Sequence, residues 1–197
     1  MLDFNNLPAK DKLYYLDTES GQAIYCCDNR EVLPLFPDKA FDLVLTDPPY
    51  GVGIDYESYD DSVDNLTELL TTILPIVRLK GKRVLLSCGV SNMWLYPKPD
   101  YVIAWNIPSA VTCGKWGFIS WSPILAYGKD PYLELGLGSR PTLITMTETS
   151  EKNGHPTPKP LKFWKLLTIR GSVFQSDLIL DPFLGSGTTA VAAKILV

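Results

Sequence analysis

Histidine is the scarcest chemistry-bearing residue of this chain, since His155 is the only one among 197 residues. The four cysteines, Cys26, Cys27, Cys88 and Cys113, show no C-x-x-C spacing. These two shortages argue against a Cys/His metal cluster, so we expect no metal site. Free cysteines of this kind are typical of a reduced cytoplasm, which we expect as the compartment.

A secretory start and long apolar runs are also missing. Residues 1–6, Met-Leu-Asp-Phe-Asn-Asn, have neither the basic nor the apolar stretch of a signal peptide. The sequence offers no apolar run of membrane-spanning length, no internal repeat and no low-complexity tract. With 46% hydrophobic residues, the chain can bury a core as one domain with an insertion.

The chain also lacks an excess of basic residues, with 18 Lys and Arg against 22 Asp and Glu. The net charge of −4 argues mildly against a nucleic-acid partner, because such partners usually demand a basic face. The charges are unevenly distributed, with basic residues over 78–83 and again over 152–170, and five acids over 55–64. Each of these runs also fits an ordinary solvated surface, so charge alone does not decide the partner.

What the chain does contain is a four-residue turn at the end of an apolar run. Residues 41–46 (Phe-Asp-Leu-Val-Leu-Thr) are typical of a short buried strand, which two prolines then end. The turn Asp47-Pro48-Pro49-Tyr50 offers a carboxylate and a carbonyl as acceptors beside an aromatic ring. Such a turn suits a planar substrate that carries an exocyclic amine. The plain alternative is a Pro-Pro loop with an ordinary tyrosine.

A second motif lies near residue 180. The strand-like residues 178–180 lead into Asp181-Pro182-Phe183-Leu184-Gly185-Ser186-Gly187-Thr188-Thr189, and a helix-like stretch follows. Glycines let a backbone approach a ligand closely, and a helix N-terminus presents N–H groups to a carboxylate or phosphate. Alone this turn fits many nucleotide folds; with the first motif it is specific.

Together the two motifs resemble those of S-adenosylmethionine-dependent DNA amino-methyltransferases. The order, with the Asp-Pro-Pro-Tyr turn first, resembles their β class, which includes restriction-modification, phage and orphan methylases. Residues 155–161 (His-Pro-Thr-Pro-Lys-Pro-Leu) and 121–129 resemble connecting segments of that class. The resemblance spans roughly residues 21–197 and implies a cytoplasmic enzyme of a bacterial, archaeal or phage-infected cell.

The resemblance assigns roles to particular residues. Asp47 and the Pro48 carbonyl would accept the amine hydrogens, Pro49 would stiffen the turn, and Tyr50 would stack on a base flipped out of duplex DNA. Transfer would be direct and in-line.

The cofactor would contact Asp28, Asp47, Asp181, Phe183, Gly185, Ser186, Gly187 and Thr188. Asp28 can equally cap a helix, and Phe183 can belong to the core. Phosphate or base contacts are expected from Lys98, Lys115, Lys129, Arg140 and Lys159, and His155 can touch cofactor or phosphate.

Strands alternating with helices predict a doubly wound, mainly parallel, Rossmann-like sheet. We expect a catalytic domain over 1–90 and 151–197, and a target-recognition insertion over 91–150. We expect strands at 23–27, 41–46, 83–88 and 178–180, and helices at 29–35, 65–79, 160–169 and from 188. Ligands of such sheets bind at the carboxyl ends of the strands, where both motifs lie.

One departure from the family pattern concerns the last part of the sheet. Relatives follow the glycine turn and its helix with a strand that ends in a ribose-binding acid. We therefore expect a C-terminal segment, or a partner chain in a homodimer, to complete the sheet. Asp47 favours adenine N6 as the methyl acceptor. The alternatives are cytosine N4, RNA methylation, and a catalytically silent remnant that binds DNA or cofactor.

Overall fold

The computed structural model describes residues 3–56, 59–110, 112–148, 154 and 156–196. The strands are β1 (Leu13–Asp17), β2 (Gln22–Tyr25), β3 (Phe41–Thr46), β4 (Asp55–Tyr56), β5 (Tyr59–Asp60), β6 (Gly81–Ser87), β7 (Tyr101–Asn106), β8 (Cys113–Gly114), β9 (Gly117–Phe118), β10 (Trp121–Tyr127), β11 (Leu143–Thr145) and β12 (Ile179–Leu180). The helices are α1 (Asn29–Val32), α2 (Val63–Lys80), α3 (Pro131–Glu134), α4 (Leu161–Gly171) and α5 (Thr188–Leu196). Short 3-10 turns include η3 (Leu33–Leu35) and η4 (Val90–Leu95).

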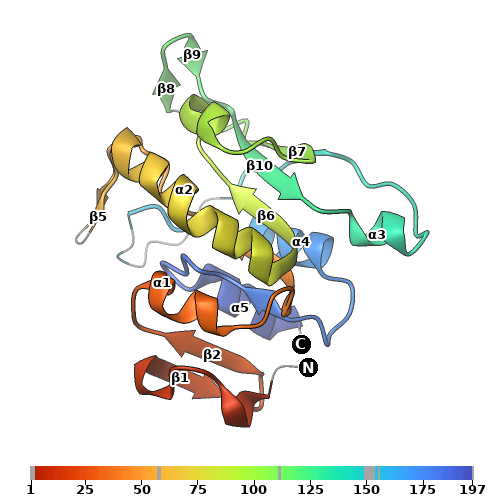
Figure 1. Cartoon of the computed structure of the whole chain (residues 1–197). Helices are drawn as coiled ribbons and strands as arrows, with labels where there is room; N and C mark the ends of the chain where they lie inside the picture. Colours follow the sequence, from red (N-terminus) through yellow and green to blue (C-terminus); the bar gives the residue numbers. More distant parts are fainter. Residues whose placement is uncertain (1–2, 57–58, 111, 149–153, 155, 197) are drawn as a thin grey trace.

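A six-stranded sheet in the order β11-β7-β10-β6-β3-β12 forms the centre of the molecule (Figure 1). Neighbouring strands pair in parallel, except that β10 runs antiparallel to both β6 and β7. The predicted mainly parallel sheet is therefore confirmed. The carboxyl ends of β3, β6, β7 and β12 lie at one edge, which we call the carboxyl edge.

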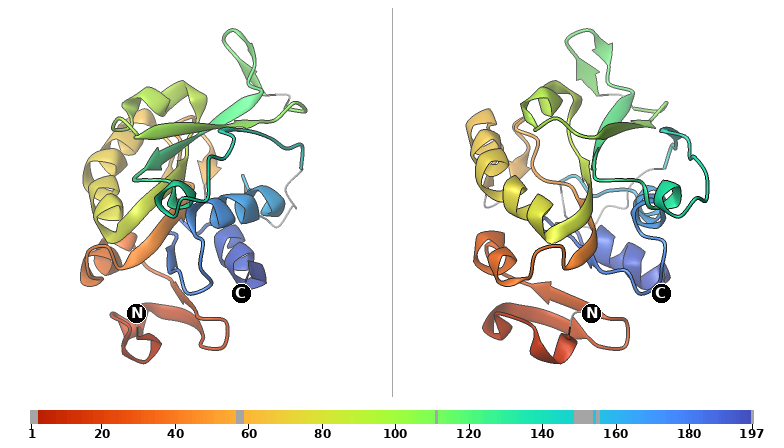
Figure 2. Two further views of the ribbon diagram at one scale, coloured as in Figure 1. Left: turned by 90° about the vertical axis from the view of Figure 1, so that its right-hand side faces the viewer. Right: turned by 45° about the vertical axis from the view of Figure 1, so that its right-hand side comes forward.

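Helices cover both faces of this sheet, as Figure 2 shows with α2 on one side and α4 and α5 on the other. Alternation along β3 explains the two layers, since successive side chains of a strand point to opposite faces. Val44 packs in the cluster under α2, whereas Leu43 and Leu45 pack with Phe163 and Leu167 of α4. All three β3 side chains are fully buried, so β3 lies at the centre of the core.

The N-terminal part departs from expectation. Residues 23–27 were predicted as a strand of the central sheet, but β2 pairs only with β1, in a separate two-stranded antiparallel sheet. Asp28 therefore does not end a strand of the central sheet. Periodicity within one strand cannot reveal its pairing partner, because that depends on residues far away in the sequence.

Residues 91–150, expected as an insertion outside the catalytic domain, contribute three strands to the central sheet. These strands, β7, β10 and β11, occupy one side of the central sheet, and mainly the β8–β9 hairpin extends beyond it (Figure 1). The assignment of DNA recognition to this range stays a prediction. Within the described part of the chain, the helices are all too short or too polar to cross a membrane.

Candidate active site

The two sequence motifs meet in one pocket at the carboxyl edge, which we call the motif pocket. It has a volume of about 230 Å³. Its walls come from the turn after β3, the glycine turn after β12, and the segment before α4. The lining residues are Asp47, Pro49, Tyr56, Thr157, Lys159, Trp164, Asp181, Phe183, Leu184, Gly185, Ser186, Thr188 and Thr189. Residues more than 130 positions apart thus share one cavity.

Asp47 is held from two sides. Its Oδ1 accepts a hydrogen bond of 2.5 Å from the hydroxyl of Tyr50, and its Oδ2 forms an ion pair with the ammonium of Lys159. Both partners of the ion pair are largely shielded, with side-chain exposures of 17% and 14%. Because each carboxylate oxygen has two lone pairs, Asp47 can still accept further N–H donors from a ligand.

Tyr50 is oriented through both its hydroxyl and its ring. The hydroxyl lies 2.7 Å from Oγ of Ser87, at the carboxyl end of the neighbouring strand β6. The ammonium of Lys159 lies 5.3 Å from the ring centroid, and a Cβ at Gly89 would approach the ring to 3.1 Å. Burial and the adjacent Asp47 carboxylate raise the pKa of Tyr50 well above its ordinary value. The hydroxyl therefore stays protonated and serves as a donor.

Asp61 and Asn92 fix the backbone that follows Tyr50. The Asp61 carboxylate, only 2% exposed, accepts hydrogen bonds from the N–H groups of Gly51 (2.6 Å), Val52 (3.2 Å) and Ile54 (3.0 Å). The side-chain amide of Asn92 donates to the carbonyls of Tyr50 (2.8 Å) and Gly51 (2.9 Å). These contacts pin the loop 50–54 against α2 and η4.

Sequence reasoning missed both Asp61 and Asn92. Asp61 belongs to the acidic run 55–64, which fitted a solvated surface equally well. The available signal was the glycine at position 51, which adopts φ +67° and leaves space that Leu66 and Asn92 occupy. A glycine directly after the motif indicates a tight turn that neighbouring side chains must hold.

Asp181 ties the glycine turn to the sheet and to α5. Its carboxylate accepts hydrogen bonds from the hydroxyls of Thr46 (2.7 Å) and Thr189 (2.5 Å) and from the N–H of Phe183 (3.0 Å). The indole N–H of Trp164 in turn donates to the Thr189 hydroxyl at 2.8 Å. Burial dominates over these hydrogen bonds and raises the pKa of Asp181 to about 6.

The glycine turn has the chemistry of a cradle for a zwitterionic ligand. Gly185 and Gly187 have φ of +52° and +82°, a conformation in which side chains are strained. The hydroxyls of Ser186 and Thr188 lie 3.0 Å apart beside the first turn of α5. Hydroxyls and helix N–H groups suit a carboxylate, while Asp47 and Asp181 supply acceptors for an amine.

A second, larger pocket of about 990 Å³ adjoins the motif pocket, and we call it the edge pocket. It lies between β2, the loop 172–178, β12 and α5. Asp181, Leu184, Gly185 and Thr189 line both pockets, so the two lie next to each other at the glycine turn.

Asp28 does not line either pocket, although its neighbours Cys27 and Asn29 line the edge pocket. Its carboxylate caps α1 by accepting the N–H of Arg30 and forms an ion pair of 2.5 Å with the Arg30 guanidinium. The hydrogen bond from the Arg30 side chain lowers the pKa of Asp28. Asp28 therefore caps α1, and its contact with the cofactor stays a prediction.

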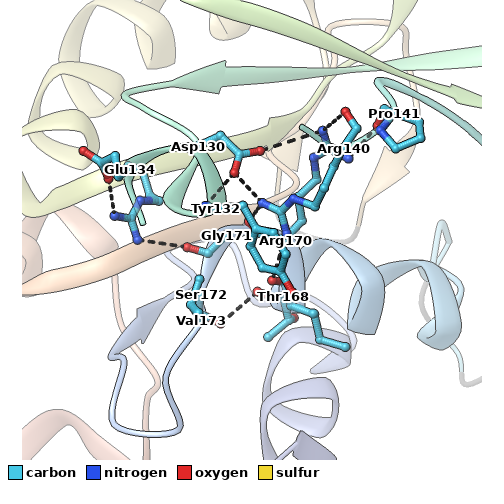
Figure 3. Close-up of polar contacts among 12 residues, drawn as sticks. Asp130, Tyr132, Glu134, Arg140, Pro141, Thr168, Arg170, Gly171, Ser172 and Val173 are labelled. Atoms are coloured by element: carbon cyan, nitrogen blue, oxygen red, sulfur yellow. Dashed lines mark hydrogen bonds and ion pairs between the residues drawn. The ribbon is translucent and has the colours of Figure 1, made fainter. Parts of the chain in front are cut away.

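The residues predicted to contact DNA differ in placement. Lys98, Lys115 and Lys129 are exposed, whereas Lys159 is drawn into the motif pocket. Arg140 is engaged internally (Figure 3): it donates to Asp130 at 2.7 Å and to the carbonyl of Arg170 at 2.6 Å. His155 lies outside the described residues. Arg140 is therefore positioned to hold α3 against α4.

The comparisons with known proteins agree on one family. A family model described as DNA methylase, of the N6/N4 type, matches residues 89–197. The type II methyltransferase M.ScaI of Streptomyces caespitosus is 27% identical, over 94% of this chain and 77% of its own length. The putative methylase YubD of Escherichia coli K12 is 30% identical, over 82% of this chain and 75% of its own length.

Solved structures show the same fold. The cytosine-N4-specific PvuII DNA methyltransferase aligns with a TM-score of 0.66 at 16% identity, covering 88% of this chain and 78% of its own. The complex of M1.HpyAVI with S-adenosylmethionine aligns with a TM-score of 0.55 at 21% identity, covering 87% of each chain.

Proposed function

The chain belongs to the N6/N4 family of DNA methylases, and from this premise we propose that it methylates N6 of adenine in duplex DNA. The observation that carries the proposal is the shared lining of the motif pocket by Asp47 and the glycine turn. One cavity thus brings acceptors for an exocyclic amine beside a cradle for the methyl donor.

The cofactor is S-adenosylmethionine, which supplies an electrophilic methyl group when bound. We propose that Ser186, Thr188 and the first turn of α5 bind its carboxylate, and that Gly185 and Gly187 allow the close approach. Phe183 lines the same pocket while packing against the core cluster under α2. Asp181 is expected to act mainly by holding the turn, because its carboxylate already accepts from Thr46, Thr189 and Phe183.

The target amine is a poor nucleophile, because its lone pair is conjugated into the purine ring. We propose that Asp47 and the Pro48 carbonyl accept its two N–H bonds, which draws the nitrogen toward tetrahedral geometry. Fixed acceptors also stabilise the positive charge that develops on the nitrogen, an effect typically worth a few kcal/mol. Pro49 keeps the turn rigid, so that the acceptors need little reorganisation.

Tyr50 would stack on the target base after it leaves the duplex. Base–aromatic stacking contributes roughly 1–3 kcal/mol and offsets part of the unpairing. The hydrogen bonds of its hydroxyl to Asp47 and Ser87 support this role, because they fix the plane of the ring. Lys159, which pairs with Asp47, would hold that carboxylate in place until the amine arrives.

Cytosine N4 is the alternative acceptor. Its amine presents the same two N–H bonds, and the PvuII enzyme, whose fold this chain shares, is named as cytosine-N4-specific. Asp at the first motif position favours adenine by family resemblance. The predicted dimer or completing segment stays a prediction; the edge pocket beside β12 is a place where a further strand would fit.

The test is incubation of the protein with labelled S-adenosylmethionine and unmethylated genomic DNA, followed by nucleoside analysis. N6-methyladenine is the expected product, and N4-methylcytosine would reassign the base. Asp47→Ala should abolish transfer while leaving cofactor affinity largely intact, because Asp181 and the glycine turn remain; Asp64→Ala, at an exposed carboxylate on α2, should leave both unchanged. Equal rates for Asp47→Ala and the parent would refute the site. Cofactor binding without any label in DNA would favour the silent remnant.

A further inference from the structure

The segment between β7 and β10 emerges on the same edge as the candidate active site. Strand β7 ends at Asn106 and the antiparallel β10 begins at Trp121, so residues 107–120 extend from the carboxyl edge. Asp47–Tyr50 follow β3 on that edge, two positions along from β10 in the sheet order. Because neighbouring strands lie about 4.8 Å apart, the base of this segment at β10 is on the order of 10 Å to the side of the turn that follows β3.

Residues 107–110 and 112–120 extend the β7–β10 pair as a two-armed ribbon, whose first arm contains a turn in which the N–H of Ala110 donates to the Ile107 carbonyl at 2.9 Å. The N–H of Ile107 donates to the Ser120 carbonyl at 2.6 Å, and that of Ile119 to the Thr112 carbonyl at 2.8 Å. Beyond them, β8 pairs with β9. Figures 1 and 2 show this ribbon projecting past the rest of the molecule. Among the described residues, backbone hydrogen bonds therefore join the two arms at the base of the ribbon and again next to its tip.

The tip of the ribbon carries Lys115 and Trp116 in a two-residue turn. Trp116 is fully exposed, and Phe118 next to it is 68% exposed. Trp105 and Trp164, by contrast, are buried core residues. An indole held in water on a projecting turn contributes nothing to the core, and exposed aromatic clusters mark binding surfaces.

We propose that the β8–β9 ribbon enters a groove of the substrate duplex and that Trp116 stacks in the gap left by the flipped base. This inference rests on the proposed function. The major groove, about 12 Å wide, admits a two-stranded β-ribbon. Lys115 is placed to contact phosphate, and apolar or aromatic side chains are the kind that insert between base steps.

The experiment measures the single-turnover methylation rate with DNA saturated by protein. The substrates are a duplex that carries the methylated site found by sequencing, and the same duplex mismatched at the target base. On the paired duplex, Trp116→Ala should lower the rate roughly tenfold, in line with lost base–aromatic stacking, and Trp116→Phe should restore most of it. On the mismatched duplex, where the base leaves the stack easily, the two rates should nearly coincide.

Tyr101→Ala is the matched control, because Tyr101 is an aromatic residue exposed at 60% at the first position of β7, at the end of the sheet opposite the carboxyl edge. It should leave both rates unchanged. An equal rate loss for Trp116→Ala on paired and mismatched DNA would indicate structural damage and overturn the proposal. A change in DNA affinity alone, with the saturated rate intact, would overturn it too.

A binding measurement without catalysis separates this inference from the proposed function. The parent should bind a duplex with a single abasic site more tightly than an intact duplex, and Trp116→Ala should lose that preference. A preference retained by the variant would refute the role of Trp116, whether or not the protein methylates DNA. An absence of methylation by the parent, with the preference present, would count against the proposed function alone.

Discussion

Asp47 and Asp181 line the same pocket yet face different partners. Asp47 pairs with the cation of Lys159 and accepts from Tyr50, so its charge is compensated next to the space where a ligand amine would bind. Asp181 accepts from Thr46 and Thr189, and burial raises its pKa. A compensated carboxylate can act on substrate, whereas a carboxylate surrounded by protein donors holds the turn.

Asp61 is the residue whose substitution best tests how the loop 50–54 is held. Asp61→Asn replaces one acceptor oxygen by an NH₂ group that faces backbone N–H donors, so the loop should loosen. We expect the single-turnover rate to fall roughly tenfold to a hundredfold, since small misplacements of reacting groups have effects of that size. Cofactor affinity, measured by calorimetry, should be unchanged.

Asp55→Asn makes the same chemical change at the exposed first position of β4, directly after this loop, and should be silent. A parallel loss of cofactor affinity in Asp61→Asn would show global damage instead of loop displacement. An unchanged rate would show that the hydrogen bonds of Asn92 to Tyr50 and Gly51 suffice to hold the loop.

At the scale of elements, β3 determines the position of the turn Asp47–Tyr50. It pairs with β6 on one side and β12 on the other, and its buried side chains contact the helices of both faces. Close packing around β3 relies on glycine. A Cβ at Gly81, the first residue of β6, would lie 2.6 Å from Cγ2 of Val44 and 3.0 Å from the Arg83 carbonyl.

Gly81→Ala should therefore destabilise the protein by about 1–3 kcal/mol, as overpacked cores typically do. Val44 is fully buried and β-branched, so its methyl group cannot swing away. Urea unfolding measures the change in the free energy of unfolding. The double variant Gly81→Ala/Val44→Ala should lose less stability than the sum of the single variants, because the second change removes the clashing methyl. Strict additivity would contradict this explanation.

At the scale of the whole molecule, the pH dependence of stability is shaped by carboxylates whose pKa values are shifted in opposite directions on folding. Hydrogen bonds from Ser20 and Arg30 lower the pKa values of Asp17 and Asp28, so their contribution is present above pH 4 and lost on acidification. Asp181 acts in the other direction. Its folded pKa of about 6 exceeds its ordinary value of 3.8, so the native state binds more protons between these values.

The contribution of Asp181 is therefore fully present below pH 4 and is lost as the pH rises to about 6, by roughly 3 kcal/mol in total. Asp181→Asn removes this titration while keeping an acceptor for Thr46 and Phe183. The free energy of unfolding of the variant relative to the parent should rise between pH 4 and 6 and then level off. A pH-independent difference would show that Asp181 titrates normally.

The sequence by itself determined the family, the cofactor and the meeting of the two motifs in one pocket. Two motifs each follow a short apolar strand, and parallel strands end at a common edge, so local pattern alone predicts that Asp47 and the glycine turn converge. The mainly parallel sheet with helices on both faces follows from the same alternation.

Only the tertiary structure decided which side chains hold those motifs in place. Ser87 meets Tyr50 because β6 lies beside β3, and Lys159 meets Asp47 because the segment before α4 crosses the carboxyl edge. Asp61 turned out buried within an acidic run, and β2 paired away from the central sheet. Each of these outcomes depends on contacts between residues distant in the chain, and hydrophobic periodicity carries no information about such contacts.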